Sequence, residues 1–223
     1  IGGPALNFDF GLVNMSVIAG RVFRDTGAGG GTANNGIQDG AEAGIPSVQV
    51  TLTNCAATIY ATAITDSAGD YEFQPTVAIP AGAAVSLCVR QRNEGDDIST
   101  AANLGGTPLP NGVATVVGGI SYLYTRATDT IQFTNATARA YTGLNFADVP
   151  DNSFAPSNSQ VANPGTIVFH PHTFIAGTGG SVSFATTAIA TPNISGWGET
   201  IYRDTNCNGQ LDSGEPLLGA PVV

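Results

Sequence analysis

The stretch that most limits how this chain folds is the loop from Asp204 to Glu215, near the C-terminus. A glycine stands at its sixth place, where it permits a sharp turn. Oxygen atoms are available at six further places, from the side chains of Asp204, Asn206, Asn208, Asp212 and Glu215 and from the backbone carbonyl of Gln210. This spacing is the ligand order of a looped Ca²⁺ site, because a hard cation takes six or more oxygens. The alternative is a solvated turn that holds no ion.

The residues on either side of this loop are not of helical type. Thr200, Ile201 and Tyr202 precede it, and β-branched and aromatic residues favour a strand. Pro216 and Pro221 follow it and would break a helix. We therefore predict a strand, the loop and a second strand, in place of the two helices that flank the loop of a calcium sensor.

A second, looser copy of the pattern begins at Asp25, and a glycine-rich insertion from residue 27 to residue 33 interrupts it. If Asn35 takes the fifth place, the ninth and twelfth places fall on two acids, Asp39 and Glu42. The third-place ligand is lost to the insertion. Two interpretations remain open for this loop, a second Ca²⁺ site and a flexible glycine-rich loop that kept part of the pattern.

The composition excludes several classes of partner. The chain has 223 residues, a net charge of −10, only 11% charged residues and no lysine. Such a surface repels nucleic acid and anionic lipid and attracts divalent cations, so we expect no nucleic-acid partner. No apolar run is long enough for a membrane span, so we expect no membrane contact in this segment. Abundant Gly, Thr, Ser and Asn indicate an all-β protein with many turns.

Three cysteines are present, at positions 55, 88 and 207. Cys55 ends one expected strand and Cys88 lies within another, so we predict a disulfide between them across one β-sandwich. The alternative is three buried or free thiols. Cys207 would then remain, and an odd cysteine suggests a partner on another chain or in sequence outside this one.

The first residues of the chain alternate between apolar and polar or small side chains. The apolar members of this alternation are Leu6, Phe8, Phe10 and Leu12. This period of two predicts an amphipathic strand. A similar run returns at residues 144–149. We expect residues 1–16 to be either a linker strand from a preceding domain or a strand donated to a neighbouring molecule.

Residues 17–149 read as one β-sandwich, because short apolar strands recur with turn signals between them. The clearest turn runs from Thr65 to Phe73, where we expect Asp66 to cap the turn and Gly69 to take a positive φ. The strands expected within residues 89–131 fit this pattern less clearly, and an insertion into the sandwich is one interpretation.

Several motifs of this region together resemble the SdrD B-like domain, a calcium-binding relative of the collagen-adhesin B-type repeats of bacterial surfaces. They are Gly20-Arg-Val-Phe-Arg-Asp25, Asn35-Gly36, Glu42-Ala-Gly-Ile45 and Thr65-Asp-Ser-Ala-Gly-Asp-Tyr-Glu-Phe73. The resemblance implies an Ig-like sandwich that binds calcium at its edge loops and acts as a stalk or spacer. It implies as ligands Asp25, Asn35, Asp39 and Glu42, with Asp66 and Asp70 as weaker candidates. The lysine isopeptide bond of some relatives cannot form in a chain without lysine.

After a polar linker at residues 151–159, the segments 162–174 and 179–184 resemble an Ig-like repeat found in tandem in large bacterial surface proteins. In those repeats further strands follow a loop like Asp204–Glu215. We therefore expect residues 150–223 to form a second Ig-like sandwich that is incomplete in this chain. Either a longer tandem array or a strand from another subunit would complete it, and head-to-tail exchange of such strands gives a filament.

Catalytic signatures are missing from the sequence. Its two histidines, His170 and His172, are two apart on one expected strand, and no third zinc ligand accompanies them. We expect no enzymatic activity.

The expected function is that of a secreted structural module in an extracellular filament or cell-surface stalk, stiffened by Ca²⁺. Its partners would be other copies of itself or neighbouring domains of a longer surface protein. The alternative is an adhesin domain in which the glycine-rich loop, Tyr122 and Tyr124 hold a host protein or glycan. The N-glycosylation acceptor pattern, which also arises by chance, occurs at Asn14, Asn135 and Asn193.

Overall fold

The structure is a computed structural model, and it describes residues 17–74, 79, 85–93, 95, 97–134, 140–186, 196 and 198–218. It is all-β, as the composition predicts. The strands are β1 Ala19–Arg24, β2 Gln49–Thr53, β3 Ile59–Ile64, β4 Asp70–Glu72, β5 Ser86–Gln91, β6 Ile98–Leu104, β7 Thr107–Leu109, β8 Ala114–Val117, β9 Ile120–Thr125, β10 Thr130–Thr134, β11 Leu144–Val149, β12 Ser153–Ala155 and β13 Thr173–Ile175. Two short 3₁₀ turns are described, η1 Ala28–Gly30 and η2 Arg126–Thr128.

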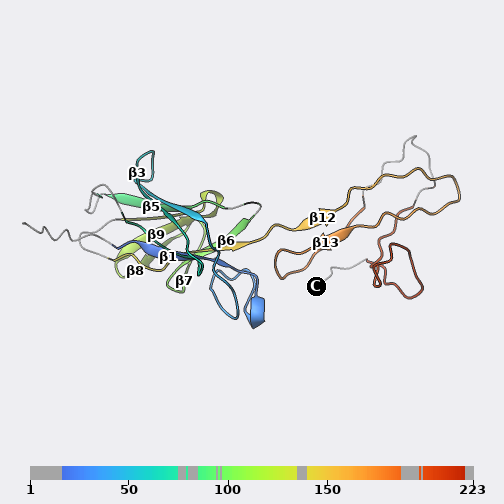
Figure 1. The fold of residues 1–223 in the computed structure, drawn as a ribbon, viewed down its shortest axis with the longest axis horizontal. Helices are drawn as coiled ribbons and strands as arrows, with labels where there is room; N and C mark the ends of the chain where they lie inside the picture. The colour runs from blue at the N-terminus through green and yellow to red at the C-terminus, as the bar shows by residue number, and fades with distance from the viewer. Residues whose placement is uncertain are drawn as a thin grey trace, which may run out of the picture.

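Strands β1 to β11 form two sheets that pack face to face. The first has the order β4-β1-β11-β6-β7 and the second the order β3-β2-β5-β10-β9-β8. All neighbours are antiparallel except β1 and β11, which run parallel with Val22 opposite Phe146. Figure 1 shows this sandwich at one end of an elongated molecule. The expected Ig-like β-sandwich is therefore present in the first region.

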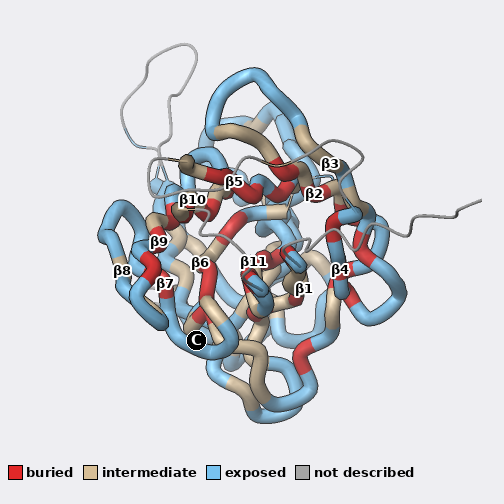
Figure 2. The backbone as a smooth tube through the Cα atoms, turned by 90° about the vertical axis from the view of Figure 1, so that its left-hand side faces the viewer, coloured by how far each residue is buried: buried red, intermediate tan, exposed pale blue. Residues whose placement is uncertain are grey.

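The core lies between the two sheets, where Figure 2 shows the buried segments facing one another. It follows the strand period: Val50 and Leu52 of β2 are buried while the residues between and beside them are only partly covered. Phe133 of β10 packs on Tyr141, with ring centroids 4.5 Å apart. Each such apolar side chain contributes about 1.5–3 kcal/mol when it is fully buried.

The turn expected between residues 65 and 73 forms as the sequence predicts. Asp66 Oδ1 accepts hydrogen bonds from the backbone N–H groups of Ala68 and Asp70, at 2.8 and 3.0 Å. Gly69 has a φ of 82°. Tyr71 and Phe73 are buried in the core. This turn starts β4, which pairs with β1.

Cys55 and Cys88 form the expected disulfide, with Cα atoms 4.9 Å apart. It does not cross the sandwich. Cys88 on β5 lies opposite Thr53 of β2, and Cys55 follows β2, so the bond joins the loop after β2 to the neighbouring strand of the same sheet. Cys207 is free and exposed.

Residues 89–131 are no insertion, and that interpretation is wrong. β6 lies between β11 and β7 in the first sheet, and β9 pairs with β10 in the second. These strands complete both sheets. Tyr122 and Tyr124 point into the core, with 5% and 0% exposure, so they are unavailable to hold a ligand as the adhesin alternative required.

The second region extends away from the sandwich (Figure 1). Part of the expected polar linker is a strand, because β12 pairs antiparallel with the distant β13 and places Phe154 opposite Phe174. The expectation of a strand through His170 and His172 is wrong, since β13 begins at Thr173. The His172 ring stacks on Phe154 at 4.9 Å. Within the described part of residues 150–218, the regular structure is this strand pair, the bridge of Tyr202 with Leu217, and a bridge position at Val182.

Candidate metal-binding loops

The loop from Asp204 to Glu215 is closed by hydrogen bonds from its own backbone to its predicted ligands. Asp204 accepts from the N–H groups of Asn208 and Gly209, at 3.2 and 2.7 Å. Glu215 accepts from the N–H groups of Thr205 and Asp212, at 2.9 and 3.0 Å. The first and twelfth places therefore hold the two ends of the loop together.

The amide side chains of this loop converge on the ninth place. Asn206 and Asn208 each donate through Nδ2 to Asp212 Oδ2, at 2.7 Å in both cases. Their Oδ1 atoms accept from the backbone two residues further on, at Asn208 and Gln210. The predicted third, fifth and ninth ligands are thus brought together in space.

The first loop repeats this network despite its insertion. Asp25 accepts from the N–H groups of Asn35 and Gly36, at 3.1 and 2.9 Å, as Asp204 does from Asn208 and Gly209. Asn35 Nδ2 donates to Asp39 Oδ2 at 3.1 Å, and Asp39 N–H donates to Glu42 Oε2 at 3.1 Å. These bonds place the four residues in the register that the sequence alignment of the two loops predicts.

The backbones of the two loops also match. The fourth place is left-handed in both, with φ of 60° at Asn34 and 58° at Cys207. The sixth place is left-handed in both, with φ of 71° at Gly36 and 75° at Gly209. Non-glycine residues with positive φ are uncommon, so this agreement at two places is a specific signature of one loop conformation.

The insertion folds as a short excursion beside the first loop. It contains η1, and Ala41 N–H donates to the carbonyl of Ala28 at 2.7 Å. Thr32 N–H donates to Asp39 Oδ1 at 2.9 Å. Its end therefore meets the ninth-place carboxylate, as the third-place side chain Asn206 does in the other loop.

The sandwich supports the first loop through residues that sequence analysis missed. Thr100 on β6 donates its hydroxyl to Asp25 Oδ2 at 2.6 Å, and Asn103 Nδ2 donates to the carbonyl of Gly36 at 2.7 Å. Asp25 is fully buried. Thr100 and Asn103 lie on a strand far along the chain from the loop, so no local pattern could identify them.

The second loop is mostly exposed and is held by its flanks. Tyr202 and Leu217 form a bridge, and Arg203 N–H donates to the carbonyl of Pro216 at 3.0 Å. The flanks thus pair as antiparallel backbone, without helices, which agrees with the strand and loop order predicted. Backbone N–H groups, chiefly that of Gly209, lower the pKa of Asp204, so its carboxylate is ready to bind a cation.

The oxygen ligands that the two loops offer suit a hard cation, but the carboxylates of each loop do not converge on one point in this structure. Among the described residues, no three His, Cys, Asp or Glu side chains lie together as a metal site of their own. The loops offer amide and carbonyl oxygens in addition. For the Asn206 and Asn208 side chains to turn their oxygens toward an ion beside Asp212, each would have to release the backbone N–H that its oxygen accepts. Glu215 would have to turn inward as well.

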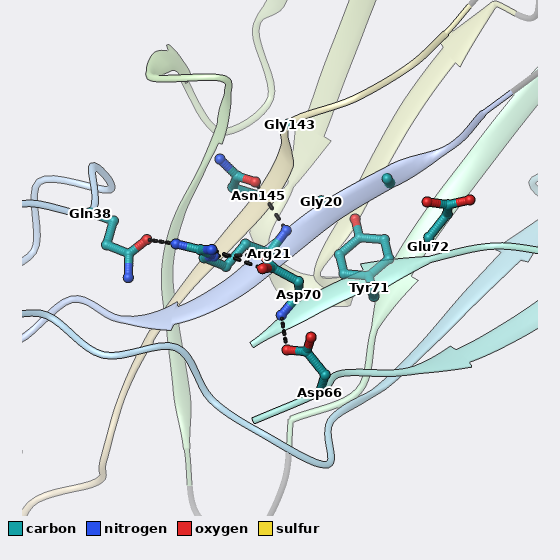
Figure 3. Close-up of a pocket in the computed structure, with 10 residues that line it drawn as sticks. Gly20, Arg21, Gln38, Asp66, Asp70, Tyr71, Glu72, Gly143 and Asn145 are labelled. Carbon is teal, nitrogen blue, oxygen red and sulfur yellow. Dashed lines mark hydrogen bonds and ion pairs between the residues drawn. The ribbon is translucent and has the colours of Figure 1, made fainter. Parts of the chain in front are cut away.

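Asp66 and Asp70, the weaker ligand candidates, line a shallow hollow beside β1 (Figure 3). Arg21 binds both carboxylate oxygens of Asp70, at 2.6 and 2.9 Å, and donates to Gln38 at 3.0 Å. Asp66 caps its turn. Both acids already have partners, so they organise the hairpin and the strand pairing.

The second region, residues 150–218, contacts the sandwich at the first loop, which begins at Asp25. Asn34 Nδ2 donates to the carbonyl of Gly179 at 3.3 Å, and the Thr178 hydroxyl lies 3.5 Å from the carbonyl of Asp25. Gly177 packs against Pro150, the residue that follows β11, so closely that a Cβ atom would lie 1.8 Å from the Pro150 carbonyl oxygen. The first loop therefore lies at the junction between the two regions.

Some predicted sites lie outside the described residues. These are the N-terminal strand with Leu6, Phe8, Phe10 and Leu12, and the three acceptor positions Asn14, Asn135 and Asn193. Within the part of the chain that is described, no helix has the length and apolarity needed to cross a bilayer.

Comparison with protein families matches residues 18–104 to the SdrD B-like domain. The match contains β1, the first loop and the strands up to β6. Comparison with curated proteins returned no match.

Proposed function

We propose that this chain is a calcium-stiffened segment of an extracellular filament or surface stalk, because residues 18–104 match the SdrD B-like domain, a structural module of the cell-surface adhesin type. The observation that carries the proposal is the shared network of the two loops. They have different lengths and different surroundings, yet they hold the predicted ligand residues in one register.

Each loop would hold one Ca²⁺ ion through its own oxygens. In the second loop these are the predicted set from Asp204 to Glu215, and in the first they are Asp25, Asn35, Asp39 and Glu42. Bound Ca²⁺ supplies positive charge that neutralises the carboxylates crowded in each loop. Since the unfolded chain has no such site, binding stabilises the folded loop.

The position of the first loop suggests how an ion would stiffen the molecule. Its Asn34 and the carbonyl of Asp25 meet Thr178 and Gly179 of the second region. An ion that fixes Asp25 and Asn35 would therefore also fix the surface on which the second region rests. A stalk needs such a junction, because contacts between regions of one chain are otherwise free to rearrange.

Assembly between chains is the second part of the proposal. The β12–β13 pair leaves large apolar side chains uncovered, with Phe154 59% and Ile175 62% exposed. A two-stranded sheet is marginal in water and gains stability from a further strand. The alternating residues 6–12 have the composition of such a strand, and donation from one copy to the next would give a head-to-tail polymer.

The calcium part is tested by replacing the twelfth-place glutamates, Glu42→Gln and Glu215→Gln, in the full chain. Addition of CaCl₂ should raise the thermal unfolding midpoint of the wild type. At a hundredfold excess over the dissociation constant, one bound ion adds about 2.7 kcal/mol to the free energy of unfolding. Each variant should need more calcium and bind one ion fewer by titration calorimetry. X-ray scattering should show a less extended molecule after chelation.

Glu72→Gln serves as the matched control, because Glu72 is exposed on β4 and outside both loops. It should behave as the wild type in every measurement. Equal calcium binding by the wild type and both loop variants would reject the loops as calcium sites.

The assembly part is tested by electron microscopy of the full chain with the double change Phe8→Asp and Phe10→Asp. Fibres should be lost, because two charged side chains are costly to bury against the exposed apolar side chains of β12 and β13. Asn7→Asp places a charge on the other face of the same strand and should leave fibres intact. Fibres that survive the double change would reject strand donation, and dispersed wild-type particles would favour a stalk built from one longer chain.

A further inference from the structure

A cluster of buried oxygen atoms lies between the two sheets, at the end of the sandwich from which the chain leaves toward β12. Gln91 ends β5, Asp129 precedes β10 and Asp148 lies on β11. Their exposures are 2%, 5% and 0%. Figure 2 shows β5 and β10 on one side of the core and β6 and β11 on the other. The cluster therefore bridges the two sheets.

The members of the cluster contact one another directly. Gln91 Nε2 donates to Asp148 Oδ2, and Gln91 N–H donates to the carbonyl of Asp129 at 3.0 Å. The Tyr124 hydroxyl donates to Asp129 Oδ1 at 2.9 Å. Each carboxylate thus has one oxygen with a donor and one oxygen without.

Three oxygens of the cluster are buried without any hydrogen-bond partner: Gln91 Oε1, Asp129 Oδ2 and Asp148 Oδ1. An unpaired buried acceptor costs about 1–3 kcal/mol, and an unpaired buried charge costs more. Arg24, on the first sheet, donates to Asp97 at 2.6 Å and, among the described residues, forms no ion pair with the two buried acids. Burial, the largest cause in each case, raises the pKa of Asp129 to about 8 and of Asp148 to about 6, so the fold leaves both charges poorly compensated.

We propose that the free oxygens of Asp129, Asp148 and Gln91 form an interior site for one Ca²⁺ ion between the two sheets, separate from both loops. A ligand set made only of oxygens selects a hard cation, and a divalent ion balances two carboxylates. Ca²⁺ fits better than Mg²⁺ because it accepts irregular geometry, whereas Mg²⁺ demands a near-ideal octahedron. Asn93 links the cluster to β6, because it accepts from Gln91 Nε2 at 3.1 Å and donates to the Ser99 hydroxyl at 3.1 Å. The Ser99 hydroxyl thereby offers a fourth oxygen beside the cluster.

The interior site adjoins the first loop through one backbone contact, since Asp25 N–H donates to the carbonyl of Asp148 at 2.9 Å. An ion held by Asp148 would steady the strand end that supports Asp25. The two sites would therefore assist each other while remaining separable by mutation.

The test measures bound Ca²⁺ per chain by equilibrium dialysis, in a full chain that carries Glu42→Gln and Glu215→Gln to weaken the loops. This background should retain one tightly bound ion. Adding Asp129→Asn should remove that ion. Adding Asp151→Asn instead should leave it, because Asp151 is exposed and lies outside the cluster and both loops.

A second variant, Gln91→Met, covers the case in which Asp129→Asn does not fold. Methionine keeps the length and the burial but removes the amide oxygen, and calcium affinity should fall by about tenfold or more. Circular dichroism checks that each variant is folded.

The competing occupants of the cluster give distinct results. If protons fill it, Asp129→Asn raises the unfolding temperature equally with calcium and with chelator, and the ion count does not change, which overturns the proposal. The proposal is also overturned if the chain with both loop glutamate changes binds no more calcium than the same chain with Asp129→Asn added. If the loops bind no calcium but the interior site does, the result is different. The wild type then binds one ion, which Asp129→Asn removes and the loop glutamate changes leave in place.

Discussion

The two calcium-type loops are built alike and supported differently. Asp25 and Asp204 accept the same pair of backbone N–H groups, and the fourth and sixth places of both loops are left-handed. Asp25, however, is fully buried and also accepts from Thr100, whereas the second loop is bordered by a single isolated bridge. The conformation therefore follows from local sequence, while its rigidity depends on the surrounding fold.

This difference indicates a division of roles. The first loop is held by hydrogen bonds from the sandwich, so the proposed calcium ion would order little additional chain there. The second loop has few contacts of its own and should gain most of its order from the ion.

The largest expected effect comes from removing the first ligand of each loop. Asp25→Ala leaves the N–H groups of Asn35 and Gly36 and the Thr100 hydroxyl without their acceptor, and should destabilise the sandwich by about 3–4 kcal/mol. Asp204→Ala should leave sandwich stability unchanged. Urea unfolding in the presence of chelator, followed by circular dichroism, measures both.

The conservative change Asp25→Asn should fall between the wild type and the alanine variant, because it keeps one acceptor oxygen. If Asp25→Ala and Asp204→Ala had equal effects on the urea midpoint, the proposed difference in support between the loops would be wrong.

An intermediate effect is expected at the sixth place. A Cβ atom at Gly36 would lie 2.4 Å from Cβ of Ala101, in addition to the cost of its left-handed φ. Gly36→Ala should therefore cost about 2–3 kcal/mol in the same unfolding assay. At Gly209 the nearest atoms, in Pro171, lie at 3.8 Å, an ordinary contact.

Gly209→Ala should weaken calcium binding by the second loop without lowering the unfolding midpoint of the sandwich. Calorimetric titration alongside urea unfolding separates these outcomes. A Gly36→Ala protein as stable as the wild type would mean that the sandwich does not hold the first loop rigidly.

The smallest effect is expected at a surface acid outside both loops. A hydrogen-bonded ion pair with Arg21 lowers the pKa of Asp70. The pair therefore stabilises the fold above the unfolded-state pKa of Asp, about 3.9, and this contribution is lost as pH falls through the lower folded pKa. Because both side chains are substantially exposed, Asp70→Asn should cost less than about 1 kcal/mol at neutral pH.

Thermal unfolding of Asp70→Asn and the wild type should converge as the pH is lowered below 4, roughly the unfolded-state pKa of the group. Glu72→Gln, at an exposed neighbour on β4 that forms no ion pair with any described residue, serves as the matched control. If Asp70→Asn destabilised the protein as much as Asp25→Ala, surface ion pairs would contribute as much to the stability of the first region as the buried loop does.

Much of the first region could be predicted because its signals are local. Asp66 and Gly69 mark their turn within a few residues, and the alternation around Val50 and Leu52 marks a strand. Two interpretations were wrong for the opposite reason: residues 89–131 as an insertion, and the polar stretch at Phe154 as a linker without a strand. Those strands form by pairing with strands that are distant in sequence, and the sequence of a short segment does not show which strand it will pair with.

The sequence by itself determined the ligand spacing, the glycine at the sixth place and the register of both loops, because these depend on hydrogen bonds between residues a few positions apart. Only the tertiary structure decided which loop is supported. Thr100 reaches Asp25 from 75 positions away, and Gln91 reaches Asp148 from 57. Such contacts depend on how the strands pair and how the two sheets pack, so the buried cluster of Gln91, Asp129 and Asp148 becomes visible only in the folded sandwich.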